Sequence, residues 1–135
     1  RSLASTVVSE RIRSELDQER PEAQRLAQLL DEAGEHHLGL DQQAVLLGLK
    51  RAALQRLENA DGSKADLTRL DDAAVFVRLM GSFGTPFSLW KLQNRVHQLA
   101  DHYQRHVAEA ESPVSREWCS RYRHLAKALN LRVGN

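Results

Sequence analysis

The sequence has few cysteines, aromatic residues and helix breakers. Its 135 residues contain one cysteine, Cys119, which excludes an intrachain disulfide and a zinc site built on several thiolates. Aromatic residues make up 5%, and the chain has 7 glycines and 3 prolines. Because secreted domains of this size are often stapled by disulfides, the lone cysteine favours a reducing, cytoplasmic location.

Neither sign of charge dominates, and long apolar runs are missing. Nineteen Lys and Arg residues face 18 Asp and Glu residues, for a formal net charge of +1. This balance excludes a strongly basic protein that binds nucleic acid through bulk charge. No apolar stretch approaches the roughly 18 residues of a membrane span, so we expect no membrane contact. The chain begins at Arg1 rather than Met, and we expect it to be a fragment of a larger protein.

The residues that are abundant favour helices. Hydrophobic residues make up 41% and charged residues 27%, as in ordinary globular domains. Apolar residues recur every three or four positions in each segment, which is the helical period. We therefore predict an all-α fold, a single domain over residues 1–135 built as a bundle of about six antiparallel helices. The predicted helices cover about 3–18, 21–35, 41–59, 66–80, 85–111 and 113–129.

Helix ends and core positions follow from the same patterns. Asp41, Asp66 and Ser112 are the expected N-caps, and Pro113 suits a first helical position. Residues 44–49 are apolar on nearly every side, which predicts burial on more than one face. Residues 85–111 predict the longest helix, because their apolar stripe keeps steps of three or four for about six turns.

One histidine-rich face is a candidate metal site. His102 and His106 lie four residues apart and Glu109 three further on, so the three side chains share a helical face. They flank the apolar stripe, and a solvated strip is the alternative. Nothing else supplies a strong further ligand, so we expect no tight metal site and no cofactor. His36 and His37 form a weaker candidate in a loop.

The sequence offers little for catalysis. Cys119 follows Trp118 in an apolar stretch, where a lone cysteine is more often a small core residue than a nucleophile. Residues 81–84 lack the Lys-Ser/Thr pair and the preceding strand of a phosphate-binding loop. We therefore expect that this chain is not itself catalytic.

The C-terminal segment is mildly basic. Aromatic residues are interleaved with the cations there, a combination that could contact a phosphate backbone or an acidic partner. Glutamates at 109, 111 and 117 dilute the charge, so we rank nucleic acid below a protein partner. The candidate nucleic-acid residues are Arg116, Arg121, Arg123 and Lys127.

The most specific motif is the segment 87–94, Phe-Ser-Leu-Trp-Lys-Leu-Gln-Asn, which opens a helix. With the helical segments before it, from about residue 3 to residue 100, it resembles a helical region of unknown function. That region follows the catalytic part of alpha-amylase/alpha-mannosidase-like proteins of glycoside hydrolase family 57. The motif-like positions are Leu89, Trp90, Gln93 and Asn94. Residues 112–135 extend past the expected end of that region, which is a departure from its pattern.

The resemblance implies a role without chemistry of its own. Catalysis in that family needs a Glu and an Asp held in a barrel domain, and this chain has no strands from which to build one. The chain would then be the C-terminal accessory domain of an α-glucan-acting enzyme, which packs on the catalytic domain or shapes the edge of its cleft.

Trp90, Gln93 and Asn94 have two interpretations. They could bind a sugar ring, through stacking on the indole and hydrogen bonds from the two amides. Alternatively, Trp90 is a core anchor and the amides bond the backbone of the 81–84 turn. We expect the structural role, in which Trp90→Ala would cost about 3–5 kcal/mol.

Taken together, the sequence predicts a non-catalytic helical domain that acts through packing and protein–protein contact. One alternative is an enzyme accessory domain with a direct carbohydrate role. Another is a regulatory helical module that binds another protein or nucleic acid.

Overall fold

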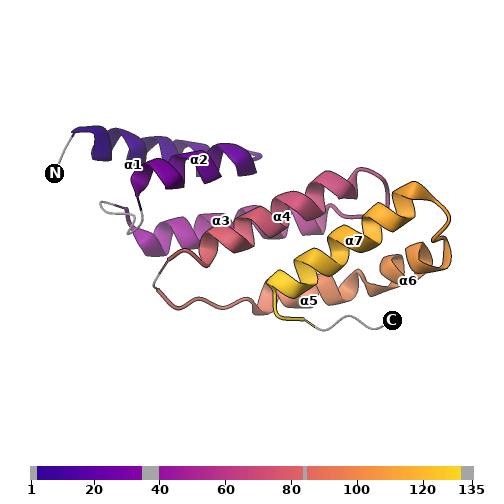
Figure 1. Ribbon diagram of the computed structural model, residues 1–135. Helices are drawn as coiled ribbons and strands as arrows, with labels where there is room; N and C mark the ends of the chain where they lie inside the picture. The colour runs from indigo at the N-terminus through magenta and orange to yellow at the C-terminus, as the bar shows by residue number, and fades with distance from the viewer. Residues whose placement is uncertain (1–2, 35–39, 84, 132–135) are drawn as a thin grey trace. The chain divides into compact units, whose positions relative to one another are not determined.

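The computed structural model describes residues 3–34, 40–83 and 85–131, and its regular elements are all helices (Figure 1). The expected all-α class is therefore confirmed for the described part of the chain. Seven helices are present there, one more than expected. They are α1 (Leu3–Leu16), α2 (Ala23–Ala33), α3 (Gln42–Glu58), α4 (Asp66–Met80), α5 (Trp90–Gln98), α6 (Ala100–Ala108) and α7 (Pro113–Ala128).

The chain divides into two compact units. The first unit comprises residues 1–52 and 75–87, and the second comprises residues 53–74 and 88–135. The division runs through α3 and α4, so the first unit holds the start of α3 and the end of α4. The second unit holds the other ends of these two helices together with α5, α6 and α7.

In the first unit, α1 and α2 pack as an antiparallel hairpin (Figure 1). The Oε2 atom of Glu15 accepts a hydrogen bond of 2.9 Å from the backbone N–H of Glu22, just before α2 begins. Ile12 of α1 and Leu26 of α2 are fully buried. Burial on α2 also includes Leu29 and Leu30.

The start of α3 follows the sequence closely. Asp41 Oδ1 accepts a hydrogen bond of 3.1 Å from the Ala44 N–H, which confirms Asp41 as the N-cap. One turn later, Gly48 lies against Leu16 of α1. A Cβ at position 48 would come within 3.0 Å of Leu16 Cδ1. Glycine in a helix interior costs about 1 kcal/mol relative to alanine, and a Cβ here would require the Leu16 side chain to shift.

In the second unit, α6 and α7 form a second antiparallel pair (Figure 1). Ser112 caps α7 as expected, since its Oγ accepts a hydrogen bond of 3.4 Å from the Ser115 N–H, and Pro113 is the first helical residue. The core of this pair is aromatic. Tyr122 stacks on Trp118 and on Tyr103, with ring centroids 5.4 and 4.7 Å apart.

The prediction of one long helix over residues 85–111 is wrong. Helix α5 begins only at Trp90, and the helical structure is interrupted at Leu99, before α6 begins. The Leu99 N–H bonds the Val96 carbonyl three residues back, at 3.0 Å. The same carbonyl accepts a 2.8 Å hydrogen bond from the Tyr122 hydroxyl of α7. A distant side chain therefore interrupts the helical ladder, although no local breaker residue stands there.

Two side chains of α5 hold the ends of other helices. The Arg95 guanidinium donates to the carbonyls of Leu57, Glu58 and Ala60, at 2.9, 3.4 and 3.4 Å. The carbonyls of Leu57 and Glu58 end α3 and that of Ala60 follows it, where a cation also suits the helix dipole. Gln93 Nε2 donates to the Leu129 carbonyl just after α7, at 2.8 Å.

Candidate functional site

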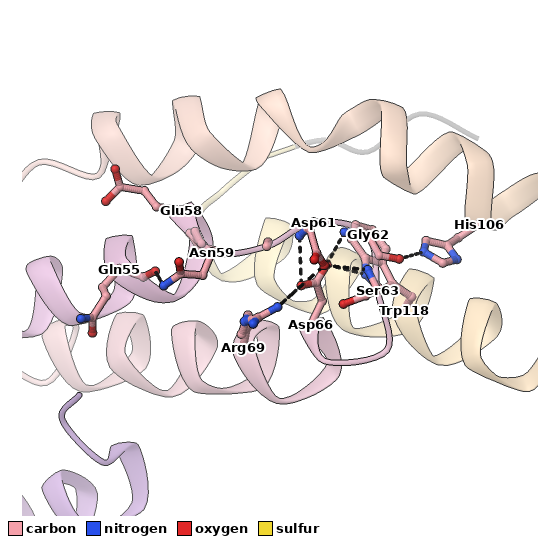
Figure 2. Close-up of polar contacts among 12 residues, drawn as sticks. Gln55, Glu58, Asn59, Asp61, Gly62, Ser63, Asp66, Arg69, His106 and Trp118 are labelled. Atoms are coloured by element: carbon pink, nitrogen blue, oxygen red, sulfur yellow. Dashed lines mark hydrogen bonds and ion pairs between the residues drawn. The ribbon is translucent and has the colours of Figure 1, made fainter. Parts of the chain in front are cut away.

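A buried carboxylate organises the second unit. Asp66 is 0% exposed, and its two oxygens accept four hydrogen bonds (Figure 2). Oδ1 accepts from the Asp61 N–H at 3.2 Å and from Arg69 at 3.0 Å. Oδ2 accepts from the Gly62 N–H at 2.7 Å and from the Trp118 indole N–H at 3.0 Å. These charge-assisted bonds offset the cost of burying the charge.

Asp66 was expected to be the N-cap of α4, with its side chain bonded to the first turn of that helix. This prediction is wrong, because the side chain has other partners. The carboxylate accepts hydrogen bonds from backbone N–H groups of the loop between α3 and α4, residues 59–65. It does not accept them from the first turn of its own helix. Through Trp118, it also links this loop to α7. The buried surroundings explain the change of role, because four donors converge on this side chain.

His106 of α6 holds the same loop from the other side (Figure 2). Its Nε2 lies 2.7 Å from the Gly62 carbonyl and its Nδ1 lies 2.8 Å from Ser115 Oγ. A carbonyl can only accept, so Nε2 carries a proton, and in the neutral ring Nδ1 accepts from the Ser115 hydroxyl. The imidazole also stacks on Trp118, with centroids 4.8 Å apart.

Gly62 is required where this loop meets α6. Its φ of +86° is a conformation that side chains rarely adopt, and a Cβ would lie 2.5 Å from His102 Nδ1. Beside it, hydrogen bonds from Ser63 hold the pKa of the exposed Asp61 carboxyl below its usual value, with Arg69 adding to the effect. The loop is thus fixed by its backbone conformation as well as by its partners.

The candidate metal ligands are not brought together around a common point. Both ring nitrogens of His106 have partners in Gly62 and Ser115. His102 Nδ1 lies 3.1 Å from an Arg105 guanidinium nitrogen, and Glu109 is exposed just after α6. In the described segments, no group of three or more His, Cys, Asp or Glu residues is placed to hold a metal ion. His36 and His37 lie outside the described residues.

Two candidate nucleophiles of the second unit, Ser115 and Cys119, are enclosed. Ser115 meets a histidine but is 1% exposed. Cys119 is buried as expected, and burial raises the pKa of its thiol, although Arg123 opposes the shift. Since the thiolate is the reactive form, a buried thiol with a raised pKa is a poor nucleophile.

The four candidate nucleic-acid residues are mostly occupied within the chain. Arg116 donates to the Ala110 and Glu111 carbonyls, both at 2.9 Å. Arg121 pairs with Asp71 of α4 at 3.0 Å. The remaining two differ, because Arg123 donates to the Tyr103 hydroxyl at 3.3 Å whereas the Lys127 side chain is exposed.

The expectation that Trp90 anchors the core is wrong, because its side chain is 66% exposed. Helix α5 begins at Trp90 and buries Leu92 and Val96. Residues two apart on a helix point about 200° away from each other, so burying Leu92 turns Trp90 toward solvent. Asn94 is also exposed and lies one turn after Trp90.

Gln93 does not lie with Trp90 and Asn94 as a free amide. Its side chain bonds the Leu129 carbonyl after α7, not the 81–84 turn as expected. Gly84 lies outside the described residues. Of the two amides proposed for sugar binding, only Asn94 therefore remains on the exposed surface near Trp90.

The first unit contains an open groove of about 470 Å³ between α1 and the start of α3, which sequence reasoning missed. Residues 44–49 were expected to be buried on more than one face, yet Leu47 is 56% exposed within this groove. The continuous apolar run was the available signal. The groove is lined by Ser9, Arg13, Leu16, Asp17, Leu40, Asp41, Ala44, Val45, Leu47, Gly48 and Arg51.

Comparison of this chain with protein-family models, curated proteins and solved structures finds no match. The arguments about function therefore rest on the residues themselves. Across the described segments, no helix is both long and apolar enough to cross a membrane.

Proposed function

We propose that this chain is a non-catalytic helical module that acts by packing against another protein or domain. The observation that carries the proposal is the groove of the first unit, where Leu47 is left 56% exposed beside an apolar floor. Large apolar side chains exposed in a concave, polar-rimmed surface are typical of interaction sites.

The second unit supports the proposal from the other direction. The side chains of this unit that carry acid–base or nucleophilic groups form hydrogen bonds that hold the loop between α3 and α4 in place. Asp66 and His106 bond Gly62 of that loop, and Ser115 bonds His106. Their arrangement serves to fix the geometry of α4, α6 and α7. In the second unit these side chains therefore support packing, which is consistent with a module that has no chemistry of its own.

Photo-crosslinking tests this function. A photoreactive amino acid replaces Leu47 in the native polypeptide, expressed in its own host, and a second version carries it at Val107, which is exposed on α6. We expect a defined covalent adduct with a polypeptide from position 47 and none above background from position 107. No adduct at 47, or equal adducts at both positions, would contradict the proposal.

A second candidate function is that of an accessory domain of an α-glucan-acting enzyme, with direct carbohydrate contact. The exposed indole of Trp90 favours it, together with the exposed Asn94 one turn away. Aromatic faces stack on the apolar faces of sugar rings, and an amide can bond their hydroxyls. The resemblance of residues 87–94 to the glycoside hydrolase family 57 region points the same way. A reducing, cytoplasmic location is part of the same proposal.

Tryptophan fluorescence tests the carbohydrate role. The chain has two tryptophans, and Trp118 is fully buried, so a change on adding malto-oligosaccharide would report on Trp90. We expect a saturable change that disappears in the Trp90→Ala variant and weakens in Asn94→Ala. A titration that leaves the wild-type spectrum unchanged would exclude this role.

A further inference from the structure

The groove of the first unit is bounded by two helical stripes. On α3, the exposed residues Ala44, Leu47 and Arg51 follow one another at helical spacing. On the other side, α1 contributes Arg13 and Leu16. The stretch of lining residues from 41 to 51 is about 16 Å long, at 1.5 Å per residue. The groove therefore offers a site of about three helical turns, the contact length of a helix laid across it.

The charges at its edge are evenly divided between the two signs. Arg13 and Arg51 are the basic lining residues, and Asp17 and Asp41 the acidic ones. The ion pairs among the described residues use Arg56, Arg69 and Arg121, so neither arginine of the groove takes part in them. A groove with charges of only one sign would repel a second copy of itself. When two copies of this mixed groove meet, a basic residue of one copy can face an acidic residue of the other.

We propose that the groove is the contact between two copies of this chain, related by a two-fold axis. Leu47 of each copy enters the groove of the other, beside Val45 and Leu16. A two-fold contact uses the same surface on both molecules, and that surface must be complementary to itself. The mixed rim around an apolar floor meets this requirement. The inference rests on the proposed packing function and names its partner.

Sedimentation equilibrium of the full chain, over micromolar to high micromolar concentrations, tests this pairing. We expect the wild-type protein to show a reversible monomer–dimer equilibrium. Leu47→Lys should raise the dimer dissociation constant at least about tenfold, because it places two cations in the apolar contact. Val107→Lys is the matched control, since it changes an exposed apolar residue on α6, and it should dimerise as the wild type does.

A charge exchange tests the complementarity itself. The double variant Arg13→Glu/Arg51→Glu and the single variant Asp17→Lys should each dimerise more weakly than the wild type. A mixture of the two should form the heterodimer, because their rims then carry opposite signs. Asp41 is left unchanged, since it caps α3. Circular dichroism of each variant verifies that helix content is retained.

Several outcomes would overturn the inference. These are a chain that stays monomeric at all concentrations, a dimer that Leu47→Lys leaves intact, and a mixture of charge variants that does not associate. A monomeric chain that still crosslinks from position 47 to a different polypeptide would overturn the two-fold pairing and leave the packing function standing. A dimer with no dependence on Leu47 would place the contact elsewhere on the surface.

Discussion

Substitution of Asp66 gives the sharpest test of the second unit. Asp66→Ala removes the acceptor of four donors, including the Trp118 indole, which is fully buried. A buried donor left without a partner costs about 1–3 kcal/mol. The Arg69 side chain is 24% exposed and can hydrogen-bond to water instead, so losing its bond to Asp66 costs less free energy. We therefore expect Asp66→Ala to lower the free energy of unfolding by about 3–5 kcal/mol.

The isosteric change Asp66→Asn refines this expectation. An amide keeps one acceptor oxygen, which can still serve Gly62 and Trp118 if the NH₂ group faces Arg69 and the Asp61 N–H, which both then lose their acceptor. The remaining bonds lose the assistance of the charge, so we expect a cost of about 2–3 kcal/mol, smaller than for alanine. Against the roughly 5–15 kcal/mol of a typical domain, both losses are large.

Urea unfolding followed by circular dichroism measures these differences. Asp71→Asn is the control, because it removes a carboxylate on the same helix that is 52% exposed in its pair with Arg121. Surface pairs contribute about 0–1 kcal/mol. A double-mutant cycle with Trp118→Phe should show coupling to Asp66, since they share one hydrogen bond. If Asp66→Asn costs no more than Asp71→Asn, the view of Asp66 as the organiser of the loop is refuted.

Three other substitutions and reactions test the rest of the structure. Trp90→Ala should change the free energy of unfolding by less than about 0.5 kcal/mol, as exposed substitutions do, and a loss of several kcal/mol in urea unfolding would restore the core role. Gly62→Ala should cost about 1–3 kcal/mol in the same assay, because of its positive φ and the approach to His102, and a change below about 0.5 kcal/mol would contradict the need for glycine at this position. Cys119 should react slowly with a thiol reagent in the native protein and rapidly in urea, because it is buried and its thiol pKa is raised; equal rates would contradict its burial.

Helix existence could be predicted because it depends on local periodicity and end signals. The caps at Asp41 and Ser112 and the limits of α4 were found in this way, since a cap needs only residues within one turn of itself. The burial of Cys119 followed from its place beside Trp118 in an apolar stretch. Each of these features is set by residues close together in the chain.

The break in the predicted long helix and the exposure of Trp90 could not be read in the same way. Tyr122, 26 residues away, bonds the Val96 carbonyl and interrupts the ladder there. Packing in the second unit decides where α5 begins. It also decides which face of α5, the one with Leu92 or the one with Trp90, is buried. Periodicity assigns an apolar residue to a face, but only the three-dimensional structure decides which face is covered.

Fold class, the N-caps at Asp41 and Ser112 and the limits of α4 were therefore determined by the sequence itself, because helical period, caps and turn residues act over a few positions. The hydrogen-bonding of Asp66 and the solvent-facing Leu47 were decided by tertiary structure alone. Four donors converge on Asp66 from positions between 5 residues before it and 52 residues after it. Leu47 looks in sequence like any core leucine, and it is exposed because, among the described residues, no further helix covers the groove between α1 and α3.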